Sequence, residues 1–212
     1  MLARVVAHAI QKSNPIEFVL YWGKGPRSVV AGPELQCLDY LASLGKRVQA
    51  AYAPGVAIHL VLTDTHAQLN GHSAESIATY YREVECEARY RGFACHKLSS
   101  LTAQADIDIG SVEPPPETLS LLEQSAARWY RGEGTARDGA AKYYRMNMLE
   151  KRVIANAFPN SVFVTFNGSD QRELFPDSLP IFYMYSTKRG TAVKPWFQAA
   201  DTPVPALETA AG

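Results

Sequence analysis

Runs of apolar residues alternate with helix-period patterns along the first half of the chain. Residues 16–22 and 56–62 are short apolar runs rich in β-branched and aromatic side chains, which predict buried strands. Residues 34–51 and 74–91 instead repeat apolar side chains at helical intervals, and residues 93–97 form a third short run. The order of strand, helix, strand, helix and strand predicts a parallel sheet with right-handed crossovers.

The second half of the chain contains two predicted helices and two predicted strands. Helices are expected at residues 117–131 and 140–158, and strands at residues 162–166 and 179–185. The two strands form a C-terminal strand pair, whose direction could be antiparallel. A polar, Pro-rich loop at residues 103–116 joins the two halves and is predicted as a connection or lid within one domain.

This pattern predicts an α/β fold with a Rossmann-like parallel sheet flanked by helices. The length of 212 residues suits one domain, so residues 1–212 are assigned to a single Rossmann-like unit. Hydrophobic residues make up 47% of the chain, enough for a substantial core. Residues 202–212 are rich in Ala and Pro, and we expect them to form a flexible tail.

The charge balance limits the classes of partner. The 21 basic and 21 acidic side chains cancel, so no general attraction to a phosphate backbone or anionic lipid is expected. No stretch approaches the roughly 20 apolar residues that span a membrane. The three cysteines form no CxxC pair, which favours a reducing, cytoplasmic setting. We therefore expect a cytoplasmic protein with neither a nucleic acid nor a membrane as partner.

Candidate chemistry lies in the loops that follow the first two strands. Lys24 and Arg27 follow the first strand, and Asp64, His66 and Asn70 follow the second. Ligands of open parallel sheets bind beyond the carboxyl ends of the strands, where these loops meet. Cations on one loop, with an acid and an imidazole on the next, suit a small zwitterion or a phosphorylated sugar. The alternative is that these side chains cap turns or are merely solvated.

Metal and nucleotide cofactors are not expected from the motifs. His66 and His72 lie near an acid, but their spacing matches no common metal-ligand frame. A GxGxxG pattern and a phosphate-binding P-loop are both absent. His59, within the second strand, is predicted to be a hydrogen-bonded core histidine, and Cys86 and Cys95 to be buried small hydrophobes.

A second group of polar residues lies on the predicted helix at residues 140–158. Lys142 and Arg145 are candidate substrate-binding residues there, and Lys194 near the C-terminus is a third. Arg145 and Arg152 are seven residues apart and share one face of the helix. The alternative interpretation is an ordinary helix surface carrying ion pairs.

Several short motifs recur in the order found in one enzyme family. They are Lys24, Pro26, Glu34, Leu38, Leu41, Leu44, Arg47, Gln49-Ala50, Tyr52, Pro54-Gly55, Asp64, Tyr80 or Tyr81, Lys142 to Tyr144, Phe158-Pro159, residues 162–166 and Lys194-Pro195-Trp196-Phe197. In this order, over nearly the whole chain, they resemble the isocyanide synthases of the pyoverdine/dityrosine biosynthesis family. That family converts the amino group of tyrosine or tryptophan into an isonitrile and takes the carbon from ribulose 5-phosphate.

The resemblance implies a transferase of secondary metabolism that needs no metal or nicotinamide cofactor. Its small-molecule partners would be an α-amino acid and a sugar phosphate. Lys24, Asp64 and His66 would be catalytic, with Asp64 holding the substrate ammonium or moving a proton. Arg27 would hold a phosphate or carboxylate. The other substrate-binding residues would be Asn70, Lys142, Arg145 and Lys194.

The chain also departs from that family's pattern. The family's Ser-Asp-Gly is Thr63-Asp64-Thr65 here, and its Ser-Ile-His at a later strand end is Thr165-Phe166-Asn167. Its paired arginines and serine on the helix are replaced by Met146-Asn147-Met148, and its final histidine is Phe197. A non-catalytic ligand-binding relative is therefore an alternative to the enzyme.

A second resemblance supplies a further alternative. Residues 63–71 resemble a segment of archaeal-type tyrosyl-tRNA synthetases, whose catalytic core the cyclodipeptide synthases share. This implies a tRNA-dependent aminoacyl transferase that uses the same pocket. The adenylating HIGH and KMSKS signatures are absent, and the neutral charge argues against a tRNA partner.

Overall fold

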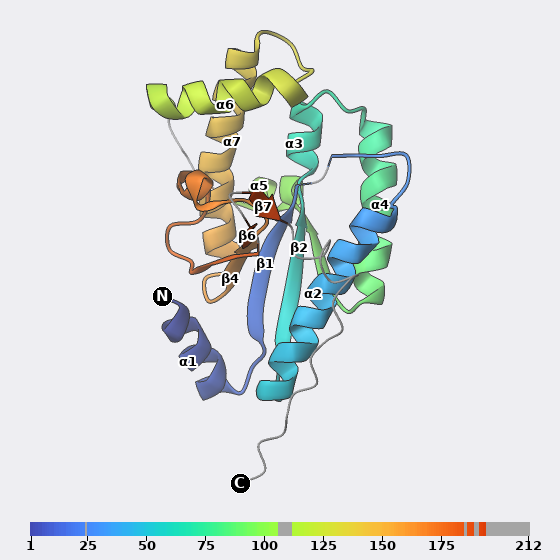
Figure 1. Ribbon diagram of the computed structural model, residues 1–212, viewed down its shortest axis with the longest axis vertical. Coiled ribbons are helices and arrows are strands. Elements are labelled where there is room, and N and C mark those ends of the chain that lie inside the picture. Colours follow the sequence, from blue (N-terminus) through green and yellow to red (C-terminus); the bar gives the residue numbers. More distant parts are fainter. Residues whose placement is uncertain (24, 106–111, 185, 189–190, 194–212) are drawn as a thin grey trace.

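The fold is a five-stranded parallel sheet covered by helices on both faces (Figure 1). The computed structural model describes all residues except 24, 106–111, 185, 189–190 and 194–212. The strand order is β3-β2-β1-β4-β5, and every neighbouring pair is parallel. The strands are β1 Ile16–Trp22, β2 Val56–Leu62, β3 Ala94–Lys97, β4 Val162–Thr165 and β5 Ile181–Tyr183. Because order reverses beside β1, the carboxyl ends of β1, β2 and β4 form the edge where such sheets bind ligands.

The helices divide between the two faces of the sheet. The first face is covered by α1 Leu2–Lys12, α2 Gly32–Ala51 and α4 Ala74–Tyr90. The second face is covered by α5 Leu98–Gln104, α7 Ala136–Ala157 and the 3₁₀ helix η1 Ser169–Leu174. Two helices lie at the end of the molecule that holds the carboxyl edge: α3 Asp64–Leu69, directly after β2, and α6 Pro116–Trp129, which packs on α7 (Figure 1).

The alternation of side chains along β1 explains why this strand is the centre of the core. Leu20 and Trp22 pack into the cluster on the α2 and α4 side, whereas Val19 and Tyr21 face the cluster on the α7 side. Val19, Leu20 and Trp22 are fully buried. A strand covered on both faces has an almost continuous apolar sequence, which is the pattern seen in residues 16–22.

The main sequence predictions are confirmed. The first two strands begin and end at the predicted residues, and they are parallel neighbours in register from Ile16 opposite Val56 to Trp22 opposite Leu62. The helix predicted at residues 74–91 is α4, and its predicted N-cap is formed because Ser73 Oγ accepts a hydrogen bond from the Ser76 amide at 3.2 Å.

The expected direction of the C-terminal strand pair was wrong. β4 and β5 do pair, but they are parallel and belong to the main sheet. Residues 166–180, which include η1, supply a crossover of the length that a parallel connection requires. A separate antiparallel pair follows, formed by β6 Ser186–Lys188 and β7 Thr191–Val193.

Other details of the sequence prediction also need correction. The Pro-rich loop expected at residues 103–116 begins later than predicted, because α5 continues to Gln104. The buried Leu98 anchors the start of this helix in the core. Cys86 is exposed on α4 rather than buried, since it lies on the face of that helix that turns away from the sheet. The helices α1, α3 and α5 were not predicted. The tail expected at residues 202–212 lies outside the described residues.

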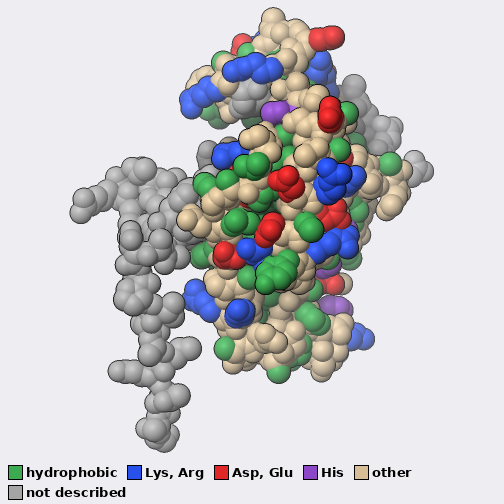
Figure 2. Space-filling view, turned by 90° about the vertical axis from the view of Figure 1, so that its right-hand side faces the viewer, with side chains coloured by type: hydrophobic (Ala, Val, Ile, Leu, Met, Phe, Trp, Pro, Cys, Tyr) green, Lys and Arg blue, Asp and Glu red, His purple; other side chains and the backbone are tan. Residues whose placement is uncertain are grey.

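The surface carries charges of both signs. On the side shown in Figure 2, Lys and Arg side chains are interspersed with Asp and Glu side chains. This agrees with the net charge of zero. Within the part of the chain that the structure describes, no helix combines the length and apolar character needed to cross a bilayer.

Candidate functional site

Asp64 lies at the point where β2 ends and α3 begins. Its side chain is almost buried, with 9% of the residue exposed. The carboxylate accepts a hydrogen bond from the Ser99 amide at 3.0 Å and a second, short one from the Ser99 hydroxyl. Ser99 belongs to the first turn of α5, where a negative charge is favoured by the free amides of the helix. Asp64 therefore ties α3 to α5 as well as lying at the ligand-binding edge.

The next two residues of α3 contact a buried acid on α7. His66 Nε2 is 2.6 Å from Glu150 Oε2, and the Thr65 hydroxyl donates to Glu150 Oε1 at 3.0 Å. The Glu150 side chain is 2% exposed and the His66 side chain is 15% exposed. A buried carboxylate that accepts hydrogen bonds from a hydroxyl and an imidazole is a partner able to orient the imidazole and balance its positive charge.

Two tyrosines complete this group. The Tyr143 ring, on α7, meets the His66 ring edge-to-face, with the ring centroids 5.2 Å apart. Burial, with a smaller contribution from the Glu150 charge, raises the pKa of Tyr143 to about 12. The same two causes raise the pKa of Tyr21 on β1 well above its ordinary value. The Tyr21 hydroxyl is buried and has no hydrogen-bond partner among the described residues. Both phenols are therefore neutral at physiological pH.

A second polar group lies on the other face of the sheet, below the loop after β1. Glu34 is fully buried at the start of α2, and its Oε1 is 3.4 Å from Arg27 Nη1. The indole of Trp22 donates to the Tyr80 hydroxyl at 3.3 Å. Burial is the main cause that raises the pKa of Tyr80 to about 12. Arg27 is thus engaged by a buried acid, although 58% of its side chain remains exposed.

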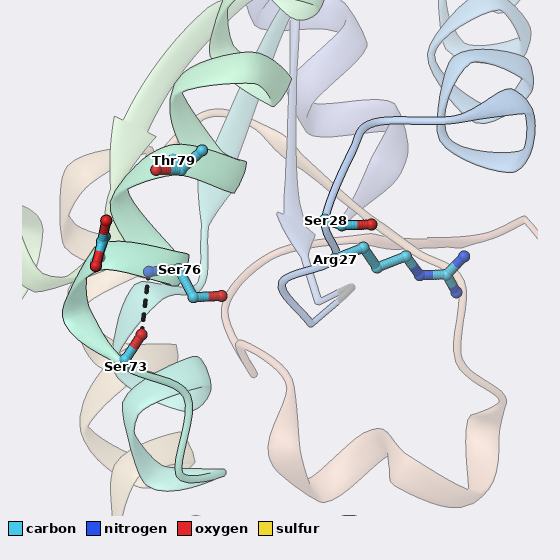
Figure 3. Close-up of a pocket in the computed structure, with 6 residues that line it drawn as sticks. Arg27, Ser28, Ser73, Ser76 and Thr79 are labelled. Atoms are coloured by element: carbon cyan, nitrogen blue, oxygen red, sulfur yellow. Dashed lines mark hydrogen bonds between the residues drawn. The ribbon is translucent and has the colours of Figure 1, made fainter.

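An open cleft of about 270 Å³ lies between this loop and α4. It is lined by Arg27 and Ser28 from the loop and by Ser73, Glu75, Ser76 and Thr79 from the start of α4. In Figure 3 the Arg27 side chain extends away from the α4 residues, as its contact with Glu34 on α2 requires. The guanidinium and the α4 hydroxyls therefore do not converge on one point in this conformation.

The remaining candidate residues are distributed over the molecule. Asn70 is the C-cap residue of α3, close to the carboxyl edge. Arg145 pairs with Glu113 across the surface of α7, which agrees with the alternative of an ion-paired helix face. Lys142 is an exposed residue on the same helix. Lys24 and Lys194 lie outside the described residues.

Sequence reasoning found the loop residues of this site but missed their partners. Glu150 and Ser99 were not singled out, and neither was Tyr21. One feature of the sequence could have pointed to Glu150. It lies seven residues after Tyr143, so the two residues share one face of the predicted helix. A buried face that carries an acid and a phenol among apolar neighbours is unusual, and charged residues are buried mainly when they are paired.

Among the residues that the structure describes, three or more His, Cys, Asp or Glu side chains nowhere gather closely enough to bind a metal ion. In the sequence, His66 and His72 lie near an acid without a common metal-ligand spacing. In the structure, the His66 nitrogen Nε2 is instead engaged by a single carboxylate, that of Glu150.

Comparison with known proteins extends the description of the fold. No protein-family model matches the chain, and no curated protein sequence matches it. Among solved structures, the chain is similar to the crystal structure of the PvcA protein from Pseudomonas aeruginosa, with a TM-score of 0.63 and 20% sequence identity. The match covers 91% of this chain and 75% of the PvcA chain. The likeness shows a fold distantly similar to that of the isocyanide synthases.

Proposed function

We propose that this protein is a biosynthetic enzyme that acts on an α-amino acid, in the manner of the isocyanide synthases. In this proposal it converts the amino group of the substrate into an isonitrile and takes the carbon from a sugar phosphate. The observation that carries the proposal is the structural likeness to PvcA over 91% of the chain, because it coincides with the ordered sequence motifs that resemble the same family.

The group of ionisable side chains at the carboxyl edge supports an enzyme rather than a passive scaffold. Asp64, His66 and Glu150 come from α3 and α7 and lie where ligands of parallel sheets bind. Buried, hydrogen-bonded acids beside an imidazole are costly for stability and occur preferentially at functional sites. Their position at the edge next to β1 supports a role in chemistry.

Within this proposal each residue has a stated role. Asp64 holds the substrate ammonium, since a carboxylate has about four lone-pair positions and Ser99 uses two of them. Lys24 and Arg27 hold a carboxylate or the phosphate of the carbon donor. Arg27 would turn from Glu34 towards the cleft beside α4 to do so. Asn70, Lys142, Arg145 and Lys194 stay as candidate substrate-binding residues.

The decisive experiment is an assay of the full chain with tyrosine or tryptophan and uniformly ¹³C-labelled ribulose 5-phosphate. We expect a product whose mass includes one labelled carbon and whose infrared spectrum contains the isonitrile stretch. Asp64→Asn should lower the rate at least tenfold, because the substrate ammonium loses its charged partner. Asp39→Asn is the matched control, since Asp39 is an exposed acid on α2 that pairs only at the surface with Arg91.

Two other outcomes would overturn the proposal. Saturable amino-acid binding without turnover under all donor conditions would identify a non-catalytic ligand-binding relative. Salt-sensitive tRNA binding together with aminoacyl transfer would identify the tRNA-dependent alternative. Thermal melts of both variants must accompany the assay, because Asp64 also connects α3 to α5 and its loss could lower stability.

A further inference from the structure

We infer that Glu150 is a positioning residue that fixes the His66 imidazole so that its Nδ1 accepts a proton from the substrate. The inference rests on the proposed function for the identity of the substrate, but it is carried by the geometry of α3 and α7. It assigns Glu150, which no sequence motif marked, to the same site as Asp64 and His66.

The first step is the state of the Glu150 carboxylate. With 2% of its side chain exposed, it has lost its hydration and must be stabilised by protein groups. Its hydrogen-bond partners among the described residues are Thr65, which donates to Oε1, and His66, which lies against Oε2. Since a carboxylate is acceptor-only, the His66 nitrogen at 2.6 Å donates its hydrogen to it. When His66 is neutral, its hydrogen is therefore on Nε2.

The second step is the state of the other ring nitrogen. With the hydrogen on Nε2, the lone pair of Nδ1 is free to accept a proton. Nδ1 has no hydrogen-bond partner among the described residues, and it is not among the atoms sealed from solvent. The His66 side chain retains 15% exposure, and Nε2 is covered by Glu150, so we place the substrate against Nδ1.

The third step is the proton transfer that this arrangement suits. An α-amino group is mostly an ammonium at neutral pH, and its nitrogen can form a bond to carbon only after it loses a proton. The N–H bond of the substrate breaks, its electron pair stays on the substrate nitrogen, and a new N–H bond forms at His66 Nδ1. The resulting imidazolium is balanced by the Glu150 carboxylate against Nε2, so the site gains no unpaired buried charge.

The neighbouring groups leave this role to His66. The titratable groups in contact with it are Tyr143 and Glu150 from α7, and Asp64 lies at the start of its own helix. Tyr21 from β1 lies near Glu150 and Tyr143, and its pKa is raised by burial first and then by their charges. The pKa values of Tyr143 and Tyr21 are raised, mainly by burial, so neither phenol accepts a proton at neutral pH. Asp64, whose oxygens also accept hydrogen bonds from Ser99, holds the substrate ammonium in the proposed function, which leaves the proton transfer to His66.

The first arm of the test measures the tautomer directly. Imidazole ¹⁵N spectra of the full chain, with His66→Gln used to assign the signal, should give a single Nε2–H tautomer for neutral His66. In Glu150→Gln the new amide can donate or accept, so both tautomers should appear. A wild-type protein in which His66 is the Nδ1–H tautomer would overturn the inference. If Glu150→Gln does not fold, Glu150→Asp is the substitute. Its shorter side chain keeps the negative charge but moves the carboxylate away from His66 Nε2, and the His66 tautomer is compared in the same way.

The second arm measures kinetics on the wild type and three variants. His66→Gln should lower kcat by about 10²- to 10⁴-fold, the usual contribution of a general base. Glu150→Gln should lower kcat by at least tenfold, with KM within about twofold, and should change the shape of the pH–rate profile. Glu123→Gln, which removes an acid paired with Arg137 on the surface, is the control and should leave kcat, KM and the pH–rate profile unchanged.

The two arms separate the two proposals. If the wild type makes no isonitrile, the proposed function fails, and the tautomer of His66 still decides whether Glu150 orients it. If the wild type is active and His66→Gln retains a rate within about threefold, the proton-accepting role is wrong while the function stands. Unchanged pH–rate profiles in Glu150→Gln would likewise contradict a positioning role.

Discussion

At the scale of single residues, His59 on β2 and His96 on β3 form a polar contact that should make stability depend on pH. His59 Nδ1 and His96 Nε2 are 3.2 Å apart, and their rings stack with Phe158 beside them. One nitrogen must donate and the other accept, so the contact requires at least one neutral ring. The second nitrogen of His59, Nε2, is buried without a hydrogen-bond partner among the described residues. Protonating both rings would break the contact.

This pair predicts a loss of stability in mild acid. Burial lowers the pKa of both histidines, the His59 ring lowers that of His96 further, and Glu17 partly opposes the shift of His59. The unfolded chain therefore binds more protons than the folded chain once the pH falls below the ordinary value of 6.5. The contribution of the pair to the free energy of unfolding should be fully present above this pH. It should be lost as the pH falls below 6.5 towards the lowered pKa values of the folded state, by at most about 1.4 kcal/mol per pH unit for each proton.

Urea denaturation at a series of pH values measures this slope. His96→Gln should flatten it, because the variant removes one titrating ring and its repulsion of the other. His8→Gln, which changes an exposed histidine on α1, should leave it unaltered. An identical slope in wild type and His96→Gln would rule out the pair as the cause.

At the scale of elements, the turn between α6 and α7 is built around Tyr130. Its hydroxyl donates to the Glu133 carbonyl at 2.5 Å, and its ring packs directly on the first turn of α7. That turn starts with a capping box, in which Thr135 and Asp138 bond to each other's backbone amides. Gly139 follows, and an added Cβ there would lie 2.6 Å from the Tyr130 ring carbon Cγ. Glycine is needed for this close approach.

Gly139→Ala should therefore destabilise the protein, although alanine is the better helix former. The clash is of the kind that costs about 1–3 kcal/mol, whereas the gain in helix propensity is at most about 1 kcal/mol. Denaturant titration should give a lower free energy of unfolding for the variant. Gly32→Ala is the matched control, because nothing lies within 4 Å of a Cβ at that position in the first turn of α2.

A double variant tests the cause of this effect. Tyr130→Ala removes the ring, so the added penalty of Gly139→Ala in that background should shrink or change sign. Two strictly additive changes would mean that the ring contact is not responsible.

The contrast between predicted and unpredicted elements has a physical cause. β1 and β2 are covered on both faces, so burial left an apolar signature that fixed their ends. β5 has three residues and lies at the edge of the sheet, where its pairing depends on the path of residues 166–180 rather than on its own pattern. The helices α3 and α5 have six and seven residues, which is less than two full turns each. They are too short for the spacing of apolar residues to indicate a helix.

The candidate site could be predicted in part because its loops follow strands that the apolar pattern identified. Loop residues such as Asp64 and His66 follow apolar strands, and the topology of parallel sheets brings such loops together. Glu150 could not be assigned to the site from the sequence, because the side of α7 that faces the sheet is set by tertiary packing. Once α7 lies on the sheet, its buried residues Tyr144, Met148 and Glu150 are carried to the carboxyl edge and the core below it.

At the scale of the whole molecule, the layers differ in how firmly they are held. The central strand β1 pairs with β2 on one side and β4 on the other, and both of its faces are covered. Helix α6 stands apart from the sheet and packs on α7, mainly through a smaller cluster that includes Leu119, Ala126 and Tyr130. Leu122 also reaches the larger cluster on the α7 side of the sheet. Several of its residues, such as Leu121, are exposed.

Hydrogen exchange should reveal this order. The amides of Val19 and Leu20 should exchange only through global unfolding, so their protection should fall with denaturant as steeply as the global stability does. The amides of α6 should exchange through local opening, with lower protection that depends little on denaturant. Ala126, which is fully buried in α6, is the most demanding probe, because a local opening must release it as well as its exposed neighbours. If Ala126 were protected as strongly as Leu20 and with the same denaturant dependence, α6 and the sheet would be one cooperative unit and the proposed order would be wrong.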